Sequence, residues 1–317
     1  SLKPNKKQNV FDILKIKKKI SSSTIGDIRD YSKLKKKIIT SSPDFIVHMA
    51  AQPLVIESYN NPKYTYEVNI NGTLNLLNVL NETQLIKYAL IITTDKVYLN
   101  NKKKFFFKET DQLGGFDPYS NSKACTELIV SSFNNSFFNK KKIFAVTARA
   151  GNIIGGGDFS ENRIIPDFFR SLESKKKLLL RNPQSVRPWQ HILEPLYGYM
   201  LILMKLYASK KNFKEPCFNF GPQKKNNVFV ERLINQLNHQ FSNSVKILKN
   251  SKSNTLHESN YLTLDSNKSI KNLNWKPQYN FKKSIELVAN WHKEYMNGSD
   301  MSKFSEQQII NYINYLK

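Results

Sequence analysis

The sequence of 317 residues has little cysteine, no long hydrophobic run and no histidine cluster. Its two cysteines, Cys125 and Cys217, lie far apart and form no CxxC pair, so we expect no disulfide framework and infer a reducing cytoplasm. The longest apolar candidate, Leu196 to Leu206, is too short to span a bilayer and contains Lys205, which indicates a buried helix. The five histidines lack metal-ligand spacing, and we recognise no signal peptide. We therefore expect no metal site and no membrane partner.

Acidic residues are also scarce, because 25 Asp and Glu face 49 Lys and Arg, giving a formal net charge of +24. Such a charge raises the hypothesis of nucleic-acid binding. The lysines, however, occur in short runs such as Lys17 to Lys19, Lys35 to Lys37 and Lys175 to Lys177, and no run alternates with aromatic residues on a strand. We interpret the excess as surface composition and expect no nucleic-acid partner, although a positive field favours an anionic substrate.

The first half of the chain alternates short apolar runs with helical segments. Apolar strands that alternate with helices are typical of a parallel sheet covered on both faces, so the sequence predicts a doubly wound α/β fold of the Rossmann type. We expect strands at 24–28, 45–49, 90–94 and 143–148, and helices after an Asp30 cap, over 62–81 and over 118–137.

The pattern changes after Gly151, where Gly155 to Asp158 predicts a flexible turn. We expect a smaller, mostly C-terminal substrate domain. The predicted division gives 1–154 and 187–222 to a cofactor-binding domain and 155–186 and 223–317 to a substrate-binding domain. Further elements are expected at 164–172, 178–180, 195–206, 217–220, 228–241, 285–296 and 306–316.

Tyr119 and Lys123 form a Y-x-x-x-K pair, which places both side chains on one helix face, one turn apart. A lysine ammonium near a phenol favours the phenolate, so we expect a lowered tyrosine pKa. Such a tyrosine can take a proton from a sugar hydroxyl while hydride leaves the same carbon. The spacing alone is weak evidence, because this pair occurs by chance in many helices.

Polar residues at two strand ends strengthen the hypothesis. Thr93, Thr94, Asp95 and Lys96 follow one predicted strand, and Arg149 to Asn152 follow the next. Ligands bind at the carboxyl ends of strands in open parallel sheets. Thr94 could orient the same substrate oxygen as Tyr119; the alternative is that Thr94 and Asp95 merely cap a turn.

Together these residues resemble the extended short-chain dehydrogenase/reductase superfamily, and within it the nucleotide-sugar 4,6-dehydratases that act on CDP-glucose. The resemblance runs along nearly the whole chain. It is carried by Gly26 to Asp30, His48 to Leu54, Thr94 to Lys96, Asp117 to Lys123, Arg149 to Asp158 and Arg187 to Pro195, of which the last two are long and specific.

The resemblance implies a lyase with bound NAD and CDP-glucose as its small-molecule substrate. Tyr119 would deprotonate the glucose 4-hydroxyl while hydride passes from C4 to NAD. Asp95 would be the acid that protonates the departing C6 hydroxyl, and the hydride would return to C6, giving a 4-keto-6-deoxy sugar. Lys96 stands where related dTDP-glucose dehydratases carry a glutamate base, and a lysine base must be neutral. The product class implies a role in deoxysugar and O-antigen (lipopolysaccharide) biosynthesis.

The resemblance also assigns binding residues. Asp27 and Ile28 would contact the adenine end of NAD, Ala50, Ala51 and Thr93 would lie against the cofactor, and Tyr119 and Lys123 would face the nicotinamide ribose. Asn152, Arg163 and Arg187 would face the nucleotide diphosphate, and Gln52 would contact the sugar. Asp27 can instead be a turn residue, and either arginine can be a surface residue or part of an ion pair.

One departure concerns the glycine-rich turn with which the family begins, since no such turn is found in this sequence. We interpret the sequence as a fragment that lacks the first βαβ elements; the alternative is a truncated form that cannot hold NAD. Three other functions stay open: a 4-epimerase or reductase of the same superfamily, a non-catalytic nucleotide-sugar-binding protein, and a nucleic-acid-binding protein. The resemblance also implies a homodimer or higher homo-oligomer, paired through the helix over 62–81 and the Tyr119 helix.

Overall fold

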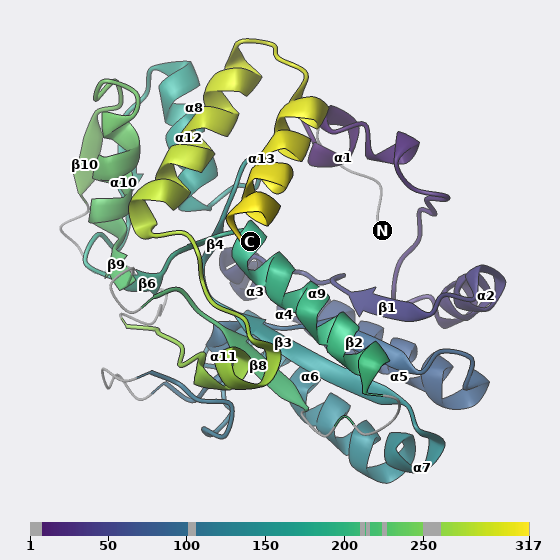
Figure 1. Ribbon diagram of the computed structural model, residues 1–317. Helices are drawn as coiled ribbons and strands as arrows, with labels where there is room; N and C mark the ends of the chain where they lie inside the picture. The colour runs from purple at the N-terminus through teal and green to yellow at the C-terminus, as the bar shows by residue number, and fades with distance from the viewer. Residues whose placement is uncertain are drawn as a thin grey trace.

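A parallel sheet forms the centre of the chain in the computed structural model, which describes residues 8–100, 106–209, 213, 216–223, 227–249 and 261–316 (Figure 1). Its strand order is β1-β2-β3-β8, and all three pairings are parallel. The strands are β1 (Phe45–His48), β2 (Tyr88–Ile92), β3 (Phe144–Ala150) and β8 (Cys217–Phe220). Three of the predicted strands and the late strand at 217–220 are thereby confirmed.

Helices cover both faces of this sheet. Alternate residues of a strand point to opposite faces, so Ala89 and Ile91 of β2 pack with one set of helices and Leu90 packs with the other. The first set is α2 (Tyr31–Ser41), α5 (Gly72–Thr83) and α6 (Pro118–Phe133), and the second is α9 (Leu193–Ala208) with α11 (Asn267–Leu273). Figure 1 shows α9 crossing the sheet on the side away from α5 and α6.

Helix starts follow the capping residues of the sequence. The Asp30 carboxylate accepts from the Lys33 amide at the start of α2, and Asp117 does the same for α6. The predicted helix over 62–81 begins at Pro62, capped by Asn61, and continues to Thr83. It consists of α4 (Pro62–Tyr66), a π-helical turn η2 (Glu67–Asn71) and α5, and a second π-helical turn, η4 (Asn134–Phe138), follows α6 before α7 (Asn139–Lys141).

The strand predicted at 24–28 is wrong. This segment contains no strand, and the sheet of the described residues ends at β1. Because an isolated extended segment gains no ladder hydrogen bonds, apolar character alone does not make a strand. The segment enters α2 instead through a turn in which the Asp30 amide donates to Asp27 O at 3.1 Å.

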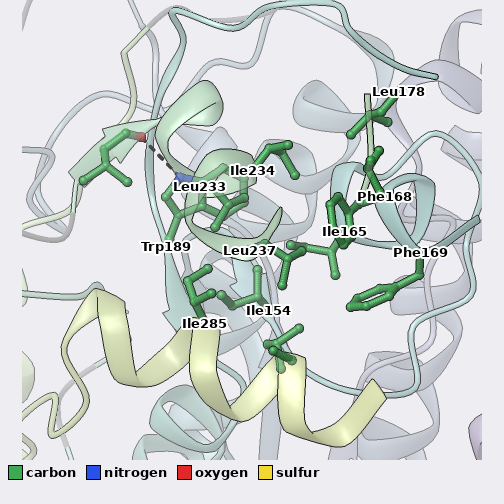
Figure 2. Close-up of a cluster of buried hydrophobic side chains, with 14 of the residues drawn as sticks. Ile154, Ile165, Phe168, Phe169, Leu178, Trp189, Leu233, Ile234, Leu237 and Ile285 are labelled. Atoms are coloured by element: carbon green, nitrogen blue, oxygen red, sulfur yellow. Dashed lines mark hydrogen bonds between the residues drawn. The ribbon is translucent and has the colours of Figure 1, made fainter. Parts of the chain in front are cut away.

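A second hydrophobic core lies beyond the sheet, between α8, α10 and α12, and Figure 2 shows its side chains. Phe168, Leu237 and Ile285 are fully buried there, and the Trp189 indole donates to Val228 O at 3.2 Å. The predicted domain boundaries stay an interpretation. The elements are α8 (Ile164–Ser174), α10 (Val230–His239), α12 (Phe281–Met296), α13 (Met301–Tyr315) and the strand pairs β4–β7 (Ile153–Ile154, Gln190–His191), β5–β10 (Leu178–Leu180, Ile247–Lys249) and β6–β9 (Val186–Pro188, Asn227–Phe229).

Four short elements complete the chain: α1 (Val10–Ile13), η1 (Ile16–Lys18), α3 (Val55–Asn60) and η3 (Asp95–Val97). In the part of the chain that the structure describes, no helix combines the length and apolarity needed to cross a bilayer.

Candidate active site

The carboxyl end of β2 and the first turns of α6 bring the catalytic candidates together. Thr93 and Thr94 follow β2 directly, and the 3-10 turn η3 begins at Asp95. The helix α6 packs against η3, and the Thr94 hydroxyl lies close enough to the Tyr119 phenol to lower its pKa. The Thr-Asp-Lys segment therefore lies beside the Tyr–Lys helix, as one shared substrate site requires.

Tyr119 is buried, and burial raises its pKa to about 12, opposite to the lowered pKa that the sequence predicted. Desolvation penalises the phenolate and outweighs the neighbouring charges. The Thr94 hydroxyl and the charge of Arg163 lower the pKa, whereas the Asp95 carboxylate raises it. The phenol is therefore protonated at neutral pH, ready to donate or exchange a proton.

Lys123 is also buried, and its Nζ donates to Ile92 O at 3.1 Å, at the end of β2. Burial lowers its pKa to about 8, and the Glu127 carboxylate acts in the opposite direction. An ammonium carries three donors, so this residue can bind further hydroxyl oxygens.

Asp95 has the features of an acid. Its side chain is only 2% exposed, and burial raises its pKa to about 6. Oδ1 accepts from the Thr94 hydroxyl at 3.1 Å, whereas Oδ2 has no hydrogen-bond partner among the described residues. The charges of Lys96 and Arg187 oppose the effect of burial. Because a buried carboxyl oxygen without a partner is costly, it is suited to contact a bound ligand.

The remaining substrate candidates approach from other elements. Arg187 of β6 is buried, and its Nη1 donates to Val186 O at 3.0 Å, while its charge acts on Asp95. Arg163, just before α8, forms an ion pair with Asp158 at 3.1 Å. Asn152 follows β3, and its backbone O accepts from the Gln190 amide at 3.0 Å.

Gln52 lies in the loop after β1 with its amide bonded inside the protein. Its Nε2 donates to Leu54 O and to Thr65 Oγ1, and its Oε1 accepts from the Leu54 amide at 2.7 Å. These contacts hold the loop together. Contact between Gln52 and a sugar stays a prediction.

The cofactor candidates lie along β1, β2 and the segment before α2. Ala50 and Ala51 follow the carboxyl end of β1. The Asp27 carboxylate accepts from the Arg29 amide at 2.8 Å and from its guanidinium, in keeping with the turn alternative. Ile28 packs so closely on Gly72 that a Cβ there would lie 2.5 Å from it. The Thr93 hydroxyl contacts the Glu127 carboxylate of α6 and Ala148 O of β3.

The sequence analysis assigns no role to Glu127, although this residue extends the motif to Y-x-x-x-K-x-x-x-E. That spacing places its carboxylate on the same helix face, one turn beyond Lys123. Arg149, which the sequence analysis names only within the segment Arg149 to Asp158, forms an ion pair with Glu127, and its Nη2 lies 2.8 Å from Glu127 Oε2.

The residues present fit one end of NAD. Lys123 offers a buried ammonium beside the strand end where a nicotinamide ribose would lie, and Tyr119 stands one turn earlier. For the pyrophosphate, the described residues supply no glycine-rich turn between a strand of the sheet and a helix.

The chain is similar in sequence to nucleotide-sugar 4,6-dehydratases. Residues 4–288 match the model of the GDP-mannose 4,6 dehydratase family. The chain is 39% identical over 310 residues to CDP-glucose 4,6-dehydratase of Salmonella typhimurium, covering 96% of this chain and 86% of that protein. It is 25% identical over 278 residues to dTDP-D-glucose 4,6-dehydratase of Homo sapiens, covering 85% and 74%.

Solved structures show the same fold. A dTDP-glucose 4,6-dehydratase of Bacillus anthracis in complex with NAD aligns with a TM-score of 0.71 at 21% identity, over 86% of this chain and 79% of that one. A UDP-glucose 4-epimerase of Thermotoga maritima with UDP-glucose aligns with a TM-score of 0.76 at 19% identity, over 86% and 84%. The α/β fold with a parallel sheet that the sequence predicted is confirmed.

Proposed function

Because the chain belongs to the GDP-mannose 4,6-dehydratase family, we propose that it converts CDP-glucose to CDP-4-keto-6-deoxyglucose. The choice of CDP-glucose is supported by the 39% identity to the Salmonella typhimurium enzyme across 96% of this chain. The proposal makes the protein an NAD-dependent lyase of deoxysugar biosynthesis that acts in the cytoplasm.

Oxidation at C4 is the first step. NAD, when bound, supplies the acceptor for the C4 hydride and later returns it to C6. Once it has become a phenolate, Tyr119 would take the proton of the 4-hydroxyl, and Thr94, whose hydroxyl lowers the pKa of that phenol, would hold the same oxygen. The Lys123 ammonium would bind the nicotinamide ribose and favour the transient phenolate.

Elimination of water is the step that separates a dehydratase from an epimerase, and Asp95 supports it best. A carboxyl with a pKa of about 6 is partly protonated near neutral pH, and its Oδ2 has no partner among the described residues. It can therefore give a proton to the departing C6 hydroxyl. An epimerase needs no acid at this place. The buried Asp95 carboxyl with its unpartnered Oδ2 is the observation that carries the proposal.

Lys96 would remove the C5 proton, which the neighbouring 4-keto group acidifies. Arg163 and Arg187 would bind the diphosphate of the substrate, because a guanidinium binds phosphate oxygens in bidentate fashion. The charge of Arg163 lowers the pKa of Tyr119, and that of Arg187 lowers the pKa of Asp95. Both arginines thus lie near the catalytic candidates, which supports an anionic group close to the reacting sugar. Asn152 and Gln52 would add polar contacts to the substrate. Asp27, Ile28, Ala50, Ala51 and Thr93 would line the cofactor.

The test is the product formed from CDP-glucose and NAD in deuterated water. We expect a 4-keto-6-deoxy sugar that carries deuterium at C5. Asp95→Asn should retain exchange at C5 but lose most of the dehydration, whereas Lys96→Met should lose both. Formation of CDP-galactose by the unmodified protein would contradict the proposal and favour a 4-epimerase.

We also propose a homodimer paired through α4–η2–α5 and α6. Leu128 lies on α6, within the proposed interface, and is 57% exposed. Leu128→Lys should convert a dimeric mass in light scattering to a monomeric one. Leu179→Lys, at an equally exposed leucine on β5, is the matched control. A monomeric mass for the unmodified protein would contradict the proposal.

A further inference from the structure

Glu127 is a buried acid that the proposed mechanism does not use. Its residue is 4% exposed, and four hydrogen bonds reach its carboxylate. Oε1 accepts from Thr93 Oγ1 and from Arg149 Nε at 3.0 Å, and Oε2 accepts from Thr147 Oγ1 at 2.7 Å and from Arg149 Nη2 at 2.8 Å. A buried charge persists only with such compensation.

The carboxylate joins three elements at the catalytic edge. It lies on α6, it accepts from two residues of β3, and through Thr93 it holds the end of β2. Thr94, which contacts both Tyr119 and Asp95, is the next residue along the chain. A displacement of Glu127 would therefore move the backbone that carries the substrate contacts.

Glu127 also acts on Lys123 through space, one helical turn away. Burial lowers the pKa of Lys123 to about 8, and the Glu127 carboxylate is the charge that raises it. Arg149 reaches in another direction, since its Nη1 donates to the Tyr98 hydroxyl at 2.9 Å and to Glu109 O at 3.2 Å. Without the carboxylate, burial would push the amine toward its neutral form, which binds hydroxyls less well and no longer favours a phenolate.

We propose that Glu127 is a positioning residue that fixes the Thr93–Thr94 strand end beside Tyr119 and holds a negative charge one helical turn from Lys123. This inference rests on the proposed function, in which Lys123 holds the nicotinamide ribose and assists Tyr119.

Other titratable groups near Lys123 do not replace Glu127. His48 of β1 interacts with Lys123, but burial lowers the pKa of that imidazole to about 3, so it is neutral in the relevant range. Its Nε2 contacts Thr73 Oγ1 at 3.1 Å. Tyr119 on α6 and Asp95 on η3 lie at the same edge, and the Asp95 carboxylate raises the pKa of Tyr119.

The first test is the more alkaline of two limbs in the rate of CDP-glucose dehydration against pH, the one that Lys123 sets near pH 8, above the limb that Asp95 sets near pH 6. Glu127→Gln should move that limb to lower pH by about one unit, since a nearby opposite charge typically shifts a pKa by one to three units. Glu127→Asp keeps the charge and should restore the limb. Thr147→Val removes a hydrogen bond to the same carboxylate without changing charge, and should leave the limb in place.

Glu127→Gln leaves the Arg149 guanidinium without its partner, so a second variant covers a failure to fold. Glu127→Gln combined with Arg149→Met removes the ion pair as a whole, which is less costly than removing one partner. It should show the same displaced limb. An unchanged limb in this double variant, with a lower rate at all pH values, would assign Glu127 a structural role alone and overturn the proposal.

The second test uses unfolding by urea and needs no cofactor. The Arg149 ion pair contributes at every pH of this range, whereas the attraction between Glu127 and Lys123 stabilises the folded protein only while Lys123 is protonated. The destabilisation caused by Glu127→Gln should therefore shrink as pH rises from 6 to 9, by about 1.4 kcal/mol for a one-unit shift. That of Thr147→Val should stay constant, and a constant difference for both variants would overturn the proposal. Because this readout involves no CDP-glucose, it stands even where the proposed reaction fails.

Discussion

At the residue scale, burial decides the protonation states of the site. Tyr119, Lys123 and Asp95 lie in the interior, and burial favours the neutral form of each. The sequence showed only that Lys123 follows Tyr119 by one turn, and from that spacing the tyrosine pKa was expected to fall. Spacing along a helix shows which side chains of that helix are neighbours. The effect of burial on a pKa depends instead on elements that pack against the residue from elsewhere in the chain.

The same effect predicts a pH dependence for dehydration. Asp95 acts as an acid only while protonated, so the elimination step should slow as pH rises above about 6, the pKa of this carboxyl. In Asp95→Asn the rate should be low and should lose this falling limb. The measurement is product formation across pH 5 to 8, with C5 exchange followed in parallel. A wild-type rate that keeps the same value across this range would remove Asp95 from the acid role.

At the element scale, the cap of α6 connects stability to activity. The Asp117 carboxylate accepts from the Ser120 amide at 2.9 Å and from the Ser120 hydroxyl at 2.6 Å. These two bonds cap the first turn of α6, which carries Tyr119. Asp117→Ala should cost about 1 kcal/mol of stability and should also lower the dehydration rate, because the first turn loosens. Asp30→Ala removes the equivalent cap of α2. It should cost a similar free energy in urea unfolding with little change in rate, and equal rate losses in both variants would contradict the argument.

The elements that the sequence predicted well are those with local signals. Pro62 and Pro118 mark helix starts, and the apolar runs of β2 and β3 could form only buried strands. The segment 24–28 was wrong because strand formation depends on a partner that no local pattern reveals. Glu127 was missed for a similar reason: its partners Thr93 and Arg149 lie 56 positions apart in the sequence. Local chemistry thus predicted the Tyr–Lys and Thr-Asp-Lys candidates, but the network beneath them depends on tertiary structure.

At the scale of the whole molecule, buried histidines couple stability to pH. Burial lowers the pKa of His48 and His292 to about 3 and that of His191 to about 4. An unfolded chain protonates these rings below about 6.5. Between that pH and about 4 the unfolded state therefore binds more protons than the folded state, and stability falls as pH falls.

Each such ring should contribute roughly 1.4 kcal/mol per pH unit within that window. Below its pKa of about 6, the folded Asp95 carboxyl binds a proton that the unfolded carboxyl does not, so this group stabilises the folded protein as pH falls. It therefore offsets the destabilisation caused by one of the three rings. We expect urea stability to start falling near pH 6.5 and to fall most steeply between about pH 6 and 5, where Asp95 offsets one of the three rings and about two rings' share remains. His191→Gln should reduce the slope by about one ring's share, whereas His239→Gln, at an exposed position at the end of α10, should leave it unchanged. A slope that His191→Gln does not alter would mean that this imidazole is already protonated in the folded protein.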